Sequence, residues 1–427
     1  MIDCSSIVSS RSKARQQESI IFPVREGTDA RKRSSGQTNG SAARTISMSE
    51  AIRIAIGAPL SGNAAALGAE MKQAIELAVE EQNADGGIAG FPIMVEGADD
   101  QGKVETGRQV ADDFCNRPDL LGVVGHYNSN VTIAAAEIYA AHDLPMITPI
   151  ASDTALTERS LPNVFRFTNR DDQTGAAISR HLYDTMGKRR AVLVETETMY
   201  GHSIGIAFSR AFLSLGGRIA ERRTVREGSR DFDPLVASLR ADFDLLFYGG
   251  SFEGAFILRA MRRAGLHQLF ASGDGCWDAV NFLEPAGETA TLGEGVLVLS
   301  ATPEVGRVAG SSDFAARYAT LFGPIGNYAV NSYDSVRVLI AAIRDAITET
   351  KGNPSRRDVL TAMRKLRFKG IAYSDPVQWD EKGDNLAVVT ALNVVENGRF
   401  RQVAEIPRTQ GGLIDAASRR PRQFLSR

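Results

Sequence analysis

The sequence lacks the features of a membrane-spanning, nucleic-acid-binding or metal-binding protein. No run of about 18 apolar residues occurs along the chain, so no membrane-spanning helix is expected. The formal net charge of the 427 residues is -2, and the basic footprint of a nucleic-acid-binding protein is missing. The five histidines are not spaced as metal ligands. We therefore expect no membrane span, no nucleic-acid partner and no metal site.

Cysteine is also scarce, and the usual signatures of catalysis are missing. The three cysteines, Cys4, Cys115 and Cys276, fit no metal motif and do not demand a disulfide framework. We expect Cys115 and Cys276 to be buried free thiols, with a disulfide between them as the alternative. Neither a GxSxG sequence nor a P-loop is present, and no nucleophile stands beside a base. An enzymatic activity and a cofactor are therefore not expected.

The two ends of the chain differ in composition from the rest. Residues 1–49 are polar, basic and rich in Ser, Arg and Gly, and residues 408–427 are similarly polar. Both segments are predicted to be disordered. The longest apolar piece near the N-terminus, IIFPV, is too short for the hydrophobic region of a secretory signal, so Cys4 is not expected to carry a lipid. Met48, just before the first predicted strand, is a candidate start site.

The remaining chain alternates short apolar runs with amphipathic segments. AIRIAIGAPL (51–60) is typical of a buried strand, and MKQAIELAVEEQN (71–83) has apolar residues at helical spacing. Further strand and helix patterns follow up to VFRFT (164–168), after which a second series begins. Strands interleaved with helices predict βαβ units and mainly parallel sheets, and two consecutive series predict two similar lobes.

Polar residues follow several predicted strands, at the positions where ligands bind in open α/β sheets. These strand tips are PLSGN, HYNSN, PIASD, TETMYG, YGGSF and SGDGCW. At HYNSN and PIASD, the hydroxyls of Ser129 and Ser152 and the N–H groups of a following helix suit a carboxylate. The alternative is that Ser129, Ser152 and Asp153 only cap those helices. Asp274 in SGDGCW is either a turn residue or the partner of a ligand ammonium. Tyr200 in TETMYG is either an aromatic wall or an ordinary half-buried residue.

Several of these tips lie in segments that resemble the leucine/isoleucine/valine-binding family of periplasmic substrate-binding proteins. The first similar segments are IAIGAPLSGNAAALG, AVEEQNADGGIAG, GVVGHYNSN, LPMITPIASDTALT and NVFRFT. Later ones are YGHSIGIAF, DFDPLVASLR, LLFYGGSFEGAFILRAMRRAGL, LFASGD, YAVNSYDSV and VQWDEKGDN. The segments follow the order of the family, and the resemblance covers about residues 50–407.

The resemblance implies an α/β fold, namely the type I periplasmic-binding-protein fold. Two Rossmann-like lobes would be joined by a hinge and would enclose a ligand cleft. Lobe 1 would comprise residues 50–168 and 300–390. Lobe 2 would comprise residues 169–299 and 391–407.

The resemblance also implies which residues contact a bound amino acid. The carboxylate would be held by Ser129, by the backbone of Ile150 and by Ser152. Asp274 would accept the ammonium group, and Tyr200 would pack over the ligand.

The loop after YGG departs from the family pattern, in which an aromatic residue often touches the ligand. Ser251 and Phe252 stand here, in a loop that is one residue shorter, and both are candidate contacts. Leu67 occupies a position that is often aromatic in members that prefer aliphatic ligands. Because the family also includes binders of amides, urea and aromatic acids, these differences leave the ligand's side chain open.

The function implied by the resemblance is ligand capture for transport. The chain would be the substrate-binding component of an ABC-type amino-acid transport system, above all for branched-chain or hydrophobic amino acids. It would work in the periplasm and deliver its ligand to the membrane permease. The alternative is a cytoplasmic regulator of the same fold that senses an amide or an amino acid, which the absence of a visible signal peptide favours. A repressor of the lactose-repressor type is not expected, because residues 1–47 lack a helix-turn-helix pattern.

Overall fold

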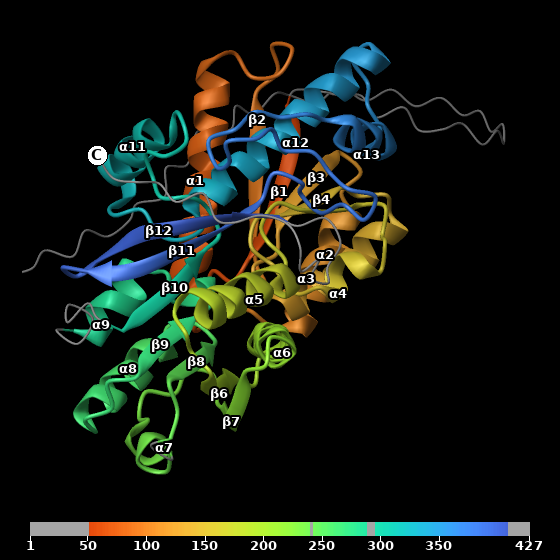
Figure 1. Cartoon of the computed structure of the whole chain (residues 1–427). Coiled ribbons are helices and arrows are strands. Elements are labelled where there is room, and N and C mark those ends of the chain that lie inside the picture. The colour runs from red at the N-terminus through yellow and green to blue at the C-terminus, as the bar shows by residue number, and fades with distance from the viewer. Residues whose placement is uncertain (1–50, 240–241, 288–294, 409–427) are drawn as a thin grey trace, which may run out of the picture. The chain divides into compact units, whose positions relative to one another are not determined.

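The structure is a computed structural model that describes residues 51–239, 242–287 and 295–408 (Figure 1). The predictions made for the two ends of the chain, among them those for Cys4 and Met48, lie outside the described residues.

The first lobe is built on a parallel sheet of five strands in the order β2-β1-β3-β4-β5. Side chains of β1 alternate between the two faces: Ile54 and Ile56 join the apolar core on one face, and Ala55 joins the core on the other. Burial on both faces explains why these strands are nearly continuous apolar runs. The strands are β1 (Ile52–Ala58), β2 (Ile93–Asp99), β3 (Leu120–Gly125), β4 (Met146–Thr148) and β5 (Val164–Arg166).

Helices cover both faces of this sheet. α1 (Ala65–Ala84) packs against α12 (Ala329–Thr350) on one face, and α2 (Val104–Cys115) packs against α3 (Ser129–Ala141) on the other. The first lobe therefore draws on two distant stretches of the chain. Its other helices are α4 (Ala155–Glu158), α11 (Ser311–Phe322) and α13 (Arg356–Lys365).

The second lobe is built on a sheet of seven strands in the order β12-β11-β10-β9-β8-β6-β7. The sheet is parallel except where β11 pairs with β10 and with β12. Its strands are β6 (Arg190–Thr196), β7 (Arg218–Val225), β8 (Leu245–Gly249), β9 (Leu269–Ser272), β10 (Val296–Ser300), β11 (Val389–Glu396) and β12 (Arg399–Pro407).

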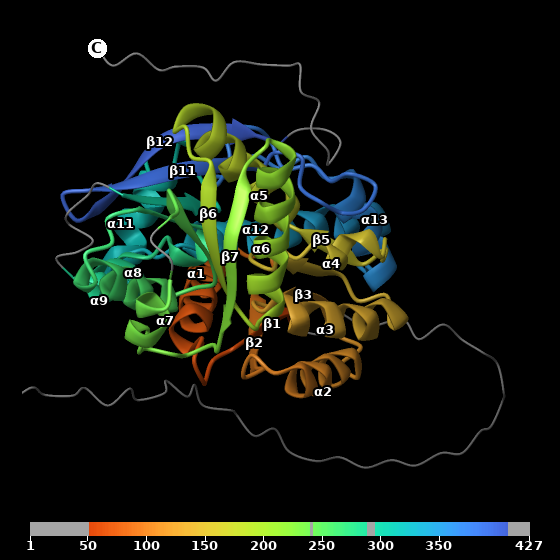
Figure 2. The ribbon, with the colours of Figure 1, turned by 60° about the horizontal axis from the view of Figure 1, so that its bottom comes forward.

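Two sets of helices also cover this second sheet. α5 (Asp171–Arg180) and α6 (Met199–Ser214) pack together against one face, beside β6 (Figure 2). The opposite face is covered by α7 (Asp233–Ala237) and α8 (Glu253–Arg263). Short helical turns complete the lobe: η1 (His181–Thr185), η2 (Asp274–Cys276), η3 (Ala279–Leu283) and α9 (Glu284–Ala286).

A buried charge cluster lies where the chain leaves the first sheet. The side chain of Arg166, the last residue of β5, is fully buried, and its Nε lies 2.8 Å from Asp384 Oδ1. Arg170 reaches the other carboxylate oxygen of Asp384 at 2.9 Å. Arg166 also donates to the carbonyls of Ala151 and Asp153, at 3.3 and 2.7 Å. These hydrogen bonds from Arg166 therefore fix the backbone of the PIASD tip.

The two cysteines within the described residues are buried free thiols. Cys115 belongs to α2 in the first lobe, and Cys276 to η2 in the second. Burial raises the pKa of the Cys115 thiol to about 11, and it raises the pKa of Cys276 as well. The prediction of free buried thiols is confirmed, and the alternative of a Cys115–Cys276 disulfide is wrong.

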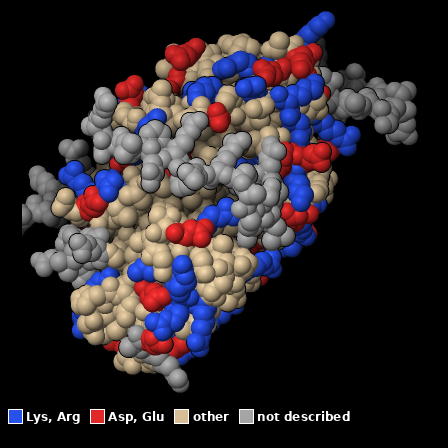
Figure 3. All heavy atoms as spheres, viewed as in Figure 1, with Lys and Arg blue, Asp and Glu red and all other residues tan. Residues whose placement is uncertain are grey.

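Neither a membrane-spanning helix nor a metal-binding cluster is found within the described part of the chain. None of its helices combines the length and the apolar character that crossing a bilayer requires. No group of three or more His, Cys, Asp or Glu side chains is placed to hold a metal ion within those same residues. On the face shown in Figure 3, acidic and basic side chains are interspersed.

Candidate ligand-binding cleft

Asp274 lies where the strand tips of the two lobes meet. It directly follows β9 and Gly273, and it is only 8% exposed. Its Oδ1 accepts a hydrogen bond of 2.9 Å from Tyr200 in the second lobe. Its Oδ2 accepts one of 3.3 Å from Tyr328 in the first lobe. A Cβ at position 273 would come within 2.5 Å of the Tyr200 hydroxyl, so glycine is needed beside this carboxylate.

Tyrosine side chains surround the carboxylate of Asp274. Burial raises its pKa, although the hydrogen bonds from Tyr200 and Tyr328 oppose that rise. Tyr127, from the HYNSN tip, packs edge-on against Tyr328 with ring centroids 5.6 Å apart. The Asn327 amide donates to the backbone carbonyl of Asp274 at 2.6 Å. A ligand ammonium at this point would therefore meet a desolvated acid framed by tyrosines, which is a strong site for a cation.

The predicted carboxylate-binding residues lie at two neighbouring tips of the first lobe. Ser129 is buried at the start of α3, and its Oγ accepts a hydrogen bond of 3.4 Å from the Asp153 N–H. The N–H of Ile150 donates to Thr148 Oγ1 at 3.3 Å. Ser152 is buried and faces the start of α5, where its carbonyl accepts from the Asp171 N–H at 3.0 Å.

Only one of these residues acts as a helix cap. Asp153 Oδ1 accepts a hydrogen bond of 2.7 Å from the Ala155 N–H at the start of α4. The N-cap residue of α3 is Asn128, and neither Ser129 nor Ser152 makes a side-chain cap bond. The capping alternative therefore holds for Asp153 alone. Ser129 instead accepts the Asp153 N–H through its Oγ and keeps its own O–H to donate, and the Ser152 hydroxyl bonds the Asp171 carboxyl.

Asp171 is a second buried acid of the cleft, and the sequence alone did not indicate it. It is 1% exposed at the start of α5, and its Oδ2 has no hydrogen-bond partner among the described residues. Burial raises its pKa to about 7; the hydroxyls of Ser203 and Ser152 oppose this rise, and the charge of Asp274 adds to it. The one signal in the sequence for Asp171 was its place as an acidic residue just after the segment in which the chain leaves the first lobe.

Glu70, on α1, is a third buried acid at the opposite side of the cleft. Its Oε1 accepts the Tyr328 N–H at 2.9 Å. Burial raises its pKa to about 8, the hydrogen bond from Tyr328 opposes the rise, and the charge of Asp278 adds to it. Burial and a neighbouring negative charge thus both raise the pKa values of Asp171 and Glu70.

The raised pKa of Glu70 predicts a stability that falls as the pH rises. In the unfolded chain Glu70 loses its proton near its ordinary pKa of 4.5, whereas the folded chain keeps it up to about 8. Between these values the folded state binds more protons, so the free energy of unfolding decreases, by at most about 1.4 kcal/mol per pH unit. Glu70→Gln should flatten this slope in urea unfolding measured from about pH 5 to about pH 8. Exposed Glu80→Gln, on the same helix, is the control. An equally steep slope in both variants would contradict the prediction.

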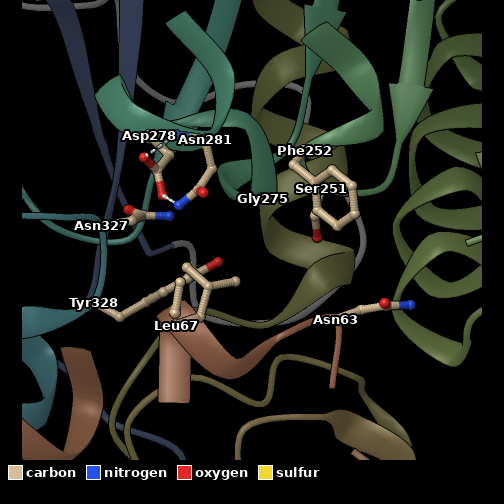
Figure 4. A pocket seen from close by; sticks show the side chains of 10 residues that line it. Asn63, Leu67, Ser251, Phe252, Gly275, Asp278, Asn281, Asn327 and Tyr328 are labelled. Atoms are coloured by element: carbon tan, nitrogen blue, oxygen red, sulfur yellow. Dashed lines mark hydrogen bonds between the residues drawn. The ribbon is translucent and has the colours of Figure 1, made fainter. Parts of the chain in front are cut away.

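A small cavity lies beside Asp274, between the lobes (Figure 4). It holds about 30 Å³ and is lined from the second lobe by Ser251 and Phe252 and from the first by Leu67 and Tyr328. A cavity of this size has room for water but not for a whole amino acid. A ligand of that size could enter only if the lobes moved apart.

The seven predicted site residues fall into three sets in the structure. Ser251 and Phe252 line the cavity, while Tyr200 and Asp274 bond each other beside it. The third segment of the site, with Ser129, Ile150 and Ser152, lies at the adjoining tips of the first lobe. The sequence alone did not identify Glu70, Tyr127, Asp171, Asn327 or Tyr328 as site residues. Tyr127 lies in the HYNSN tip, and the other four lie outside the predicted strand tips.

The sequence profile described as "Periplasmic binding protein" matches residues 51–398. The chain belongs to the periplasmic binding protein family. Leu/Ile/Val-binding protein homolog 2 of Brucella abortus is 30% identical over 336 residues, covering 78% of this chain and 87% of the relative. The amino acid binding protein of Pseudomonas aeruginosa is 29% identical over 343 residues, covering 77% of this chain and 90% of the relative.

Solved structures of this family share the two-lobed architecture. The leucine binding protein LivK of Thermotoga maritima is 25% identical, with a TM-score of 0.74, covering 83% of this chain and 99% of that one. A solute binding protein of R. palustris, solved with benzoate, has a TM-score of 0.74 at 20% identity, covering 84% of this chain and 97% of that one. At that identity the likeness supports the fold alone.

These findings confirm two predictions made from the sequence. The resemblance to the leucine/isoleucine/valine-binding family is confirmed, and so is the type I fold with its two α/β lobes and interlobe cleft. The family consists of binding proteins rather than enzymes, and relatives of this chain are substrate-binding proteins of ABC transporters.

Proposed function

We propose that this chain is the substrate-binding component of an ABC-type amino-acid transport system. It binds a zwitterion between its lobes in the periplasm and presents the closed, loaded form to the membrane permease. The names of its relatives make branched-chain amino acids the first ligands to test.

One observation carries the proposal. A buried carboxylate, Asp274, stands between tyrosines of the two lobes, and the buried hydroxyls of Ser129 and Ser152 stand at the neighbouring tips. An ammonium group needs the first and a carboxylate needs the second, so the cleft is complementary to both ends of an α-amino acid. Tyr200 and Tyr328 belong to different lobes, and both bond Asp274. A ligand ammonium that pairs with Asp274 would therefore bind best when the two lobes are closed around it, which couples binding to closure.

The proposal is tested by a thermal-shift screen of the full chain against the common L-amino acids. A ligand present at about 100 times its dissociation constant stabilises the fold by roughly 2.7 kcal/mol, which should raise the melting temperature by a few degrees. Two matched analogues of leucine dissect the response: isoamylamine lacks the carboxylate, and isocaproate lacks the amine. We expect neither analogue to reproduce the shift of the intact amino acid. A shift with isocaproate or benzoate, and with no amino acid, would refute the proposal.

A further inference from the structure

The cavity beside Asp274 offers a space for a ligand's side chain. It is lined by Gly275, the residue after Asp274, and by Tyr328, whose hydroxyl bonds the Asp274 carboxylate. The residues expected to hold the ligand carboxylate, Ser129 and Ser152, do not line it. A zwitterion held by Asp274 and the serine tips would therefore extend its side chain into this cavity, and the lining decides which side chain fits.

The lining of this cavity combines apolar side chains, among them Leu67, Phe252 and Tyr328, with a group of polar ones. The polar ones are Asn63, Ser251, Asp278, Asn281 and Asn327. Figure 4 shows Asp278, Asn281 and Asn327 gathered at one end of the cavity, with Ser251 and Phe252 at the other. An aliphatic side chain packed against that polar group would bury it without a partner, which costs free energy.

The hydrogen bonds around these amides determine which atoms are left for a ligand. Asn281 donates its Nδ2 to Asp278 Oδ2 at 2.8 Å, and Asn327 donates its Nδ2 to the Asp274 carbonyl at 2.6 Å. Both partners can only accept, so these two bonds fix the amide orientations and leave each Oδ1 as the atom that can accept from a ligand. Asn327 is 2% exposed, and its Oδ1 has no partner among the described residues. The unused capacity of this end of the cavity is therefore that of acceptors.

Charge at this end favours the same kind of ligand. Asp278 brings a carboxylate to the cavity, and Glu70 lies close enough to Asp278 for the pKa of Glu70 to be raised by that charge. No Lys or Arg is among the described residues that line the cavity. A donor group, above all a positively charged one, gains from this field, whereas a methyl group gains nothing.

We propose that the cleft selects amino acids whose side chain ends in a nitrogen that donates hydrogen bonds, in preference to branched-chain aliphatic ones. This inference rests on the proposed amino-acid-binding function and narrows its substrate class. The shared chemistry is an N–H donor at the end of a short side chain, supplied either by an amide or by an ammonium group. Leucine in the same place would leave the acceptor oxygens of Asn281 and Asn327 unpaired. We therefore expect leucine to bind about tenfold or more weakly than an amino acid with a side-chain N–H donor.

Isothermal titration of the full chain with two matched pairs of ligands tests the inference. Asparagine and leucine have nearly the same shape and differ in an amide for two methyl groups. Ornithine and norleucine differ in an ammonium for one methyl group. In at least one pair, we expect the dissociation constant of the nitrogen-bearing member to be lower than that of its partner by about tenfold or more. A preference for asparagine would identify an amide as the preferred group, and a preference for ornithine would identify an ammonium.

Variants of the lining residues sharpen the test. Asn281→Leu should weaken the preferred nitrogen-bearing ligand by about tenfold or more and should strengthen binding of its apolar partner. Because Asn281 also bonds Asp278, the exposed Asn63→Leu provides a second variant in the other lobe. Asn116→Leu, at the exposed end of α2, is the control and should change neither affinity.

The outcomes separate the inference from the function on which it rests. If leucine and norleucine bind as tightly as their partners, the inference is overturned while amino-acid binding stands. If no amino acid binds at all, the proposed function itself fails and the inference fails with it. Unchanged preference in both Asn281→Leu and Asn63→Leu would also overturn the inference, because the discrimination would then arise elsewhere.

Discussion

Replacement of Asp274 by alanine should weaken amino-acid binding by about 3 kcal/mol or more, which is at least a hundredfold in the dissociation constant. The reason is that the ligand ammonium would be buried between the lobes without its counter-charge. The tyrosine hydroxyls of Tyr200 and Tyr328, which now donate to the carboxylate, cannot replace it. Isothermal titration with the best amino acid from the screen measures the effect.

Two further variants separate the charge of Asp274 from its shape. Asp274→Asn keeps the size and one acceptor oxygen, so it should lose most of the affinity for an amino acid while the protein stays folded. Asp313→Ala removes an exposed carboxylate at the start of α11 and should leave the affinity unchanged. If Asp274→Ala bound amino acids as well as the unmodified chain, Asp274 would be only a turn residue.

Much of the fold can be predicted from the sequence because it follows from local patterns. Apolar runs such as AIRIAIGAPL become strands buried on two faces, and the amphipathic segments between them become the covering helices. Two elements between β9 and α12 were not predicted from the sequence. β10, with the apolar run VLVLS, is missing from the predicted elements, and so is α11. The predicted lobe boundaries stay a prediction.

The site is predictable only where it lies on strand tips. The rule that ligands meet the carboxyl ends of parallel strands indicates Asp274, Ser129 and Ser152, and all three are buried where the lobes meet. Glu70 and Asn281 escape that rule: Glu70 belongs to a helix body, and Asn281 belongs to a turn that the sequence does not mark. Their approach to the cleft depends on contacts between distant segments, for instance the bond from the Tyr328 N–H to Glu70.

Replacement of Asp384 by alanine should lower the free energy of unfolding by about 3–5 kcal/mol, because it leaves the buried guanidinium group of Arg166 without a counter-charge. Arg166 is fully buried, and its Nε lies 2.8 Å from Asp384, while Arg170 lies 2.9 Å from the same carboxylate. These two cations hold the pKa of Asp384 below its usual range, although burial alone would raise it. The stabilisation is therefore present above the ordinary carboxyl pKa and is lost as the pH falls below it.

Urea unfolding measures this loss, and two comparisons test its cause. Glu396→Ala breaks the exposed pair with Arg401 and should leave the unfolding midpoint nearly unchanged, since such pairs contribute little. The double replacement Arg166→Met with Asp384→Leu removes a charge of each sign and should recover part of the stability lost in Asp384→Ala. A loss below about 1 kcal/mol in Asp384→Ala would show that the two arginines are adequately solvated without it.

Because Arg166 also bonds the carbonyls of Ala151 and Asp153, Asp384→Ala should weaken ligand binding too, through displacement of the PIASD tip.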